Sequence, residues 1–189
     1  MRNVYLDHAA TTPVHPKVLE AMMPYFSGKF GNPSNLHDIG RDAKNAVEEA
    51  RGKTAGLIGA KPEEIFFTAS GAESNNFALK GLAQANSQKG KHIIVSQLEH
   101  FSILHPAKTL EKSGFTVTYL PTNREGTVDP NDVAQAITKD TVLVSIMHAN
   151  NEIGTIEPIE EISTITKEKG VLLHTDAVAS TGWIPVDVK

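Results

Sequence analysis

The chain contains no cysteine, which excludes disulfides, thiolate metal sites and a cysteine nucleophile within its 189 residues. It also lacks any apolar run long enough to cross a membrane. Its first residues have no continuous apolar core of the length found in signal peptides. We therefore expect a cytoplasmic protein with no membrane segment.

Charge of one sign is not concentrated anywhere either. The formal net charge is -4, and acidic and basic residues are interspersed along the chain. This distribution gives no basic patch for nucleic acid or for an anionic membrane, so neither is an expected partner. With 40% hydrophobic and 21% charged residues the chain can bury a core. We expect one domain over 1–189, with an N-terminal arm and loops in 1–35 and the core in 36–189.

Apolar runs rich in β-branched residues alternate with amphipathic stretches. This alternation predicts an α/β fold with a mainly parallel sheet and helices on both faces. The predicted strands are 65–68, 92–95, 115–120, 142–147 and 171–176. The predicted helices are 40–58, 76–86, a helix ending near 112, 130–136 and 159–169, and the residues before 40 are expected to be irregular.

Polar clusters follow the predicted strands. In open α/β sheets, ligands bind at the carboxyl ends of the strands, where loops present polar groups. The clusters are 69–74, 99–100, 148–152 and Asp176. If the strands are parallel neighbours, these clusters converge on one crevice.

The cluster 69–74 is a turn of small residues that leads into a helix. Such a turn exposes backbone N–H groups, and the helix dipole adds partial positive charge, so a phosphate is favoured there. An ordinary strand-to-helix turn accounts for the same residues. The spacing alone leaves both interpretations open.

Each remaining candidate has a functional and an ordinary interpretation. Asp176 would be costly to bury unless a cation or a donor met it, and the protonated ring nitrogen of pyridoxal 5'-phosphate is such a partner. The acid could equally cap the turn that follows its strand. Asn151 could donate to a ring oxygen, or serve as a turn residue. His100 could stack on a flat cofactor and move a proton, or be an ordinary polar residue.

A metal site is a further alternative. His148, Glu152, His174 and Asp176 follow or end predicted strands, and imidazole and carboxylate groups there can converge on a metal ion. No tight ligand spacing supports this interpretation. We therefore predict no metal.

Taken in order, several segments resemble the cysteine desulfurases, which are class V aminotransferase-like enzymes of fold type I. The matching segments are YLDHAATTP (5–13), GNPS (31–34), FTASGAESNN (67–76), EH (99–100), MHANNEIG (147–154) and HTDA (174–177). The resemblance covers the whole chain, and it covers only the N-terminal half of such an enzyme. It implies an incomplete large domain of a transferase that uses pyridoxal 5'-phosphate.

The resemblance also implies roles for individual residues. His100 corresponds to the histidine that stacks on the pyridine ring and takes part in proton transfer, and is the expected catalytic residue. Asn151 corresponds to the asparagine beside the ring hydroxyl, and Asp176 to the acid paired with the ring nitrogen. Gly71 and Ala72 fall where the family holds the cofactor phosphate. These five residues are the expected cofactor-binding set.

The sequence departs from the family pattern at two positions, of which one, Ala72, belongs to this set. Ala72 replaces the usual threonine or serine hydroxyl, and Ala179 replaces a glutamine near the ring hydroxyl. Losing one charge-assisted contact typically costs about 1.5–3 kcal/mol, which weakens binding without abolishing it. The family's Schiff-base lysine, catalytic cysteine and substrate-binding arginine lie further along and have no counterpart here. We therefore expect this chain alone to be inactive.

The implied reaction removes sulfur from L-cysteine to give L-alanine and a persulfide for iron–sulfur cluster or thio-cofactor synthesis. The implied partners are a second copy in a homodimer and an iron–sulfur scaffold or sulfur-carrier protein. A selenocysteine lyase or a transaminase is an alternative within the same fold type. A non-catalytic binding or dimerisation module derived from such an enzyme is another.

Overall fold

The computed structural model describes residues 3–189, and the chain divides into two compact units. The first unit extends to Phe67 and includes Pro185–Lys189, and the second covers Thr68–Ile184. Each unit is described by itself. The expectation of a single domain over 1–189 stays a prediction.

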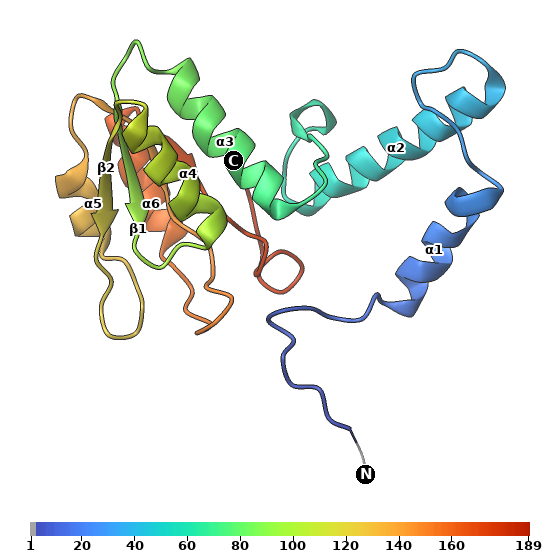
Figure 1. Ribbon diagram of the computed structural model, residues 1–189, viewed down its shortest axis with the longest axis horizontal. Helices are drawn as coiled ribbons and strands as arrows, with labels where there is room; N and C mark the ends of the chain where they lie inside the picture. The colour runs from blue at the N-terminus through green and yellow to red at the C-terminus, as the bar shows by residue number, and fades with distance from the viewer. Residues whose placement is uncertain (1–2) are drawn as a thin grey trace. The chain divides into compact units, whose positions relative to one another are not determined.

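The second unit is built on a parallel sheet. Its strands are β1 (His92–Ser96), β2 (Thr116–Leu120), β3 (Thr141–Ser145) and β4 (Leu172–His174), in the spatial order β2-β1-β3-β4. Every pairing in this sheet is parallel. Four of the predicted strands are thereby confirmed, and the order places β1 and β3 at the centre, where both are buried. Figure 1 shows β1 beside β2.

Helices cover both faces of this sheet, as predicted. They are α3 (Gly71–Ala85), α4 (Phe101–Lys112), α5 (Pro130–Ala136) and α6 (Ile159–Lys169). Because successive strand residues point to opposite faces, neighbouring residues of β1 enter different cores. Ile93 packs in a cluster with α3 and α4, whereas Ile94 packs in a cluster with α5 and α6. Figure 1 shows α4 and α6 on opposite sides of the strands.

The first unit contains α1 (Pro16–Ser27), α2 (Asp38–Leu57) and the short 3-10 helix η1 (Pro62–Glu64). The prediction of an irregular opening stretch is wrong for α1. Pro16 at the first helical position and the His15 ring, whose Nδ1 accepts from Lys17 N at 3.2 Å, start this helix. No helix in residues 3–189 is long and apolar enough to span a membrane.

The predicted strand 65–68 is also wrong. The Ile65 N–H donates to Pro62 O, which closes the turn of η1. The Ile65 carbonyl accepts a hydrogen bond from the Arg51 side chain of α2, whose guanidinium lies 5.0 Å from the centre of the Phe67 ring. This backbone is therefore bonded to a turn and a side chain instead of to a neighbouring strand.

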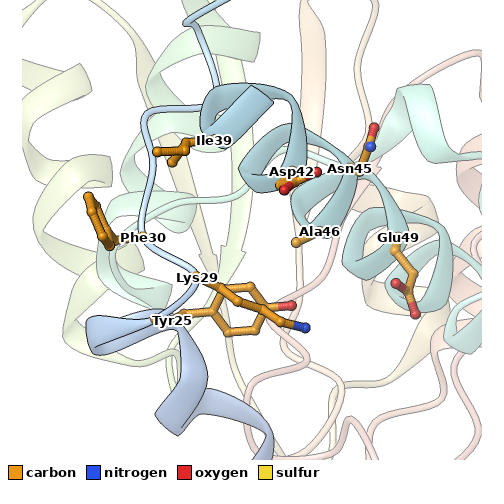
Figure 2. Close-up of a pocket in the computed structure, with 9 residues that line it drawn as sticks. Tyr25, Lys29, Phe30, Ile39, Asp42, Asn45, Ala46 and Glu49 are labelled. Atoms are coloured by element: carbon orange, nitrogen blue, oxygen red, sulfur yellow. The ribbon is translucent and has the colours of Figure 1, made fainter. Parts of the chain in front are cut away.

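A pocket of about 430 Å³ lies between the end of α1 and α2 within the first unit. Figure 2 shows Tyr25, Lys29 and Phe30 on the α1 side of it. The α2 side presents Asp42, Asn45, Ala46 and Glu49. Its lining thus combines aromatic, charged and small side chains.

The sheet packing gives a stability prediction. Leu143 of β3 is fully buried, and its register partner Leu172 of β4 is 43% exposed. Leu143→Ala should lower the free energy of unfolding by about 2–5 kcal/mol, because it removes buried methyl groups and leaves a cavity. Leu172→Ala, the matched control, should cost no more than about 1 kcal/mol. Urea unfolding of both variants checks this, and equal losses would contradict the described packing.

Candidate functional site

Three of the polar clusters meet at the carboxyl edge of the sheet, because β1, β3 and β4 are parallel neighbours. The Met147 N–H after β3 donates to Glu99 Oε1 after β1 at 2.7 Å. The His148 N–H donates to the Asp176 carbonyl after β4 at 2.8 Å. The predicted convergence is confirmed for the clusters 99–100, 148–152 and Asp176.

Asp176 is a buried acid, 8% exposed, with both carboxylate oxygens hydrogen-bonded. Oδ1 accepts from the Val178 N–H at 3.0 Å, which caps the turn after β4. Oδ2 accepts from Asn75 Nδ2 of α3 at 2.7 Å. The capping interpretation is confirmed. Each oxygen can still accept a further donor, so pairing with a ring nitrogen remains a prediction.

His100 is exposed and caps the start of α4. Its Nδ1 lies 3.1 Å from Ser102 N and 2.7 Å from Ser102 Oγ. Asn151 is half-buried in the turn after β3. Its neighbour Asn150 makes the hydrogen bonds that hold this turn, to the N–H groups of 152 and 153 and to Leu98 O. Within residues 3–189 the Asn151 amide has no hydrogen-bond partner, which leaves it open to a ligand.

The cluster 69–74 does not follow a strand, and the helix after it begins earlier than predicted. Helix α3 starts at Gly71 because Ser70 Oγ accepts from the Glu73 N–H at 3.1 Å, while Glu73 Oε2 accepts from the Ala69 N–H at 2.6 Å. The spacing of serine and glutamate is the sequence signal that was missed. The first N–H groups of a helix have no acceptor inside it, and Gly71 and Ala72 hold these positions. Their phosphate role remains a prediction.

Gly71 also lies close to the turn that follows Asp176. A Cβ placed on it would lie 2.8 Å from Cγ2 of Val178. Real Cβ atoms essentially never approach a heavy atom so closely. A side chain at this position would therefore require the exposed Val178 side chain to move.

Sequence reasoning missed Asn75 and Ser102. Asn75 is 4% exposed, and its Nδ2 lies within hydrogen-bonding distance of both Asp176 Oδ2 and Ser102 Oγ, at 2.7 and 2.8 Å. The missed signal is periodicity: Asn75, Leu79 and Ala83 form the buried stripe of α3. A polar residue in an apolar stripe needs a partner, and here the partners are site residues.

Glu99 was placed in a polar cluster by the sequence but was given no role of its own. It is 5% exposed, and burial raises the pKa of its carboxyl from 4.5 to about 8. The hydrogen bond from the Met147 N–H opposes this rise in pKa, and the nearby acids Asp176 and Glu157 add to it. Within residues 3–189 its Oε2 has no hydrogen-bond partner. Glu99 therefore ties the loop that carries His100 to the end of β3.

The histidines of the metal alternative are bonded to serines. His174 Nδ1 lies 2.9 Å from Ser145 Oγ, and His148 Nδ1 lies 2.9 Å from Ser180 Oγ. Burial lowers the pKa of His174, which favours the neutral ring. Among residues 3–189, no group of three or more histidines, aspartates or glutamates is placed to hold a metal ion.

A parallel sheet with helices on both faces and polar loops at its carboxyl edge defines an α/β fold, and its likeness to solved structures assigns it to fold type I. Solved structures agree: a NifS-like protein superposes with a TM-score of 0.95 at 41% identity, covering 99% of this chain and 52% of that one. A structure described as SspA in complex with cysteine has a TM-score of 0.94 at 43% identity, covering 97% of this chain and 53% of that one.

The chain belongs to the aminotransferase class-V family, which matches residues 4–189. Its curated relatives include the cysteine desulfurase IscS of Dictyoglomus turgidum, 60% identical over 99% of this chain and 48% of the relative. The IscS of Methanosarcina thermophila is 53% identical over 98% of this chain and 46% of the relative. The chain thus spans about half the length of the curated relatives it matches.

The raised pKa of Glu99 predicts a pH dependence of stability. Between pH 4.5 and about 8 the folded chain keeps a proton that the unfolded chain has released. The contribution of Glu99 to the free energy of unfolding should therefore fall as the pH rises through this window, by up to roughly a few kcal/mol. Glu99→Gln cannot titrate, so its stability should fall less over the same range.

Urea unfolding at pH 5, 6, 7 and 8 checks this prediction. Glu152→Gln is the matched control, since Glu152 is exposed in the neighbouring cluster. Its stability profile should follow that of the parent. Parallel profiles for the parent and Glu99→Gln would show that Glu99 does not carry the buried proton.

Proposed function

We propose that this chain forms the cofactor-binding wall of a cysteine desulfurase, which uses pyridoxal 5'-phosphate to remove sulfur from L-cysteine and release L-alanine. The observation that supports this most directly is Asp176, a buried acid at the carboxyl edge of the sheet. The strands beside it lead to the segments that carry His100 and Asn151. The family and its relatives point to the same chemistry.

The residues present fit this cofactor. Within residues 3–189 no cationic side chain pairs with Asp176, and a protonated pyridine nitrogen would supply the missing positive charge. The Asn151 amide is open to bond to a ring oxygen. The first N–H groups of α3, at Gly71 and Ala72, suit a phosphate. When bound, the ring would act as an electron sink during bond breaking at the amino acid.

His100 would have two tasks in this reaction. Its exposed ring would stack on the cofactor plane, and its Nε2 would hold a proton toward the reacting groups. Nδ1 is already engaged with Ser102, so Nε2 is the ring atom left to face the cofactor. A histidine suits this task because its ordinary pKa lies close to neutral pH.

The sulfur acceptor would lie outside these residues. The 189 residues contain no cysteine, so a protein persulfide must form on a thiol they do not contain. We propose that this chain alone does not turn over cysteine, and that segments equivalent to the second half of its relatives supply the missing groups. A cytoplasmic location, a homodimer and a scaffold or sulfur-carrier partner belong to the same proposal.

Cofactor binding is the first test. Titration with pyridoxal 5'-phosphate, followed by absorption, should saturate for the parent. Asp176→Asn keeps the shape of the acid but removes its charge, and losing a charge-assisted contact of about 1.5–3 kcal/mol should weaken binding roughly 10- to 100-fold. His100→Asn should also weaken binding, because asparagine still caps α4 but offers no ring to stack.

Matched controls separate binding from folding. Asp129→Asn changes an exposed acid that caps α5, and His105→Asn changes an exposed histidine of α4. Both should bind the cofactor as the parent does. A folded parent that shows no saturable binding, or equal losses in the controls, would contradict the proposed cofactor site.

Turnover is the second test. A chimera of these 189 residues with the second half of the Dictyoglomus turgidum desulfurase should release sulfide and alanine from cysteine in the presence of the cofactor. The chain alone should release neither. In the chimera, Asp176→Asn should abolish most turnover and Asp129→Asn should not. A chimera that binds the cofactor but yields no sulfide would instead point to another amino-acid substrate.

A further inference from the structure

We propose that Asn75 and Ser102 are positioning residues that hold His100 in one tautomer and at a fixed place relative to Asp176. The proposal rests on the proposed function, in which His100 and Asp176 both contact the cofactor. Neither Asn75 nor Ser102 would touch the reacting atoms. They would act through the two residues they connect.

Three short contacts form a continuous relay across the carboxyl edge of the sheet. Asp176 Oδ2 lies 2.7 Å from Asn75 Nδ2, and the same nitrogen lies 2.8 Å from Ser102 Oγ. Ser102 Oγ lies 2.7 Å from His100 Nδ1. The relay thus joins the turn after β4, the buried stripe of α3 and the first turn of α4.

The direction of each hydrogen bond follows from the chemistry of the groups. The Asp176 carboxylate only accepts, so Asn75 donates to it through Nδ2. This nitrogen carries two hydrogens, and the second is donated to Ser102 Oγ. The Ser102 hydroxyl oxygen therefore accepts from Asn75, which leaves its own hydrogen for His100 Nδ1.

A second donor reaches the same ring nitrogen. The Ser102 backbone N–H, which can only donate, lies 3.1 Å from His100 Nδ1. An Nδ1 that accepts from the Ser102 amide and hydroxyl cannot carry a proton of its own. The neutral His100 ring therefore has its proton on Nε2, where it can be donated to an acceptor on the ligand as a hydrogen bond.

The relay also fixes the position of His100 relative to Asp176. Asn75 is 4% exposed inside α3, so it is a rigid anchor for both the acid and the serine. A cofactor ring that contacts Asp176 at its nitrogen and His100 on its face needs these two groups at a set separation. Catalytic groups held in place by bonded supporting residues lose rate and affinity when that support is removed.

The test measures the tautomer and the cofactor affinity separately. Nitrogen-15 NMR of the ligand-free chain, at a pH where His100 is neutral, should show protonation only at Nε2. Ser102→Ala and Asn75→Ala should each introduce a measurable Nδ1-protonated fraction and weaken pyridoxal 5'-phosphate binding roughly 3- to 10-fold, as expected for one lost hydrogen bond. Ser102→Thr, which keeps the hydroxyl, should restore both properties.

Two matched controls accompany these variants. Asn76→Ala removes an amide that, among residues 3–189, bonds only to Ala72 O of its own helix. Ser113→Ala removes an exposed hydroxyl bonded to Thr109 O at the other end of α4. Both should leave the tautomer and the affinity unchanged. Ser102 is only half-buried, so its variant keeps the test valid even if Asn75→Ala does not fold.

The outcomes separate this proposal from the function it rests on. Tautomer and affinity values in Ser102→Ala equal to those of the controls would overturn the relay. A folded parent that does not bind the cofactor would contradict the proposed function. In that case the His100 tautomer alone tests the relay. A larger Nδ1-protonated fraction in Ser102→Ala supports the relay, and an unchanged fraction overturns it.

Discussion

Parallel hydrogen bonding between β1, β3 and β4 is the constraint on which the candidate site depends. Val95 of β1 pairs with Ser145 of β3, and Ser145 pairs with His174 of β4, so the three strands end side by side. Residues a few positions further along each strand must then emerge at the same edge. Any change of strand order would separate Glu99, His100 and Asp176, whatever their sequence spacing.

Buried acids convert this shared edge into a defined arrangement of loops. Glu99 accepts from the Met147 N–H, and Glu157 accepts from the Val128 N–H at 2.8 Å. Because each acid bonds to the backbone of another segment, it orders two loops at once. Burial raises the pKa of both acids and lowers the pKa of His174. In each of these side chains, burial disfavours the charged form.

The sequence predicts the parts of the fold that depend on local patterns. The unbroken apolar runs of β1 and β3 indicate strands buried on both faces, and both are found. The end of α6 is predicted at Gly170, whose φ of 67° is the left-handed conformation that favours glycine. The apolar run 65–68 is typical of a strand, but a strand also needs a neighbour, and Arg51 takes the Ile65 carbonyl instead.

Site residues were predictable where they follow strands and not where their role depends on distant partners. His100 and Asp176 stand at strand ends, which a single sequence shows. Asn75 lies 101 positions from Asp176 and 27 from Ser102, and only the packing of α3 against α4 and the turn after β4 brings the three together. Glu99 stood inside a recognised cluster, yet its hydrogen-bond donor is the N–H of Met147, 48 positions away.

The site therefore contains groups that the protein already holds and groups that it leaves open. Asp176 and His100 are fixed through Asn75 and Ser102, whereas the Asn151 amide and the first N–H groups of α3 are open to a ligand. Fixed groups lose little freedom when a ligand binds, so they contribute more of their interaction energy to affinity. Under the proposed function, Ala72 lacks a hydroxyl only in the open part that would hold the phosphate, where backbone N–H groups and the helix dipole remain. Under the proposed function, binding of the ring by preorganised groups would offset weaker binding of the phosphate.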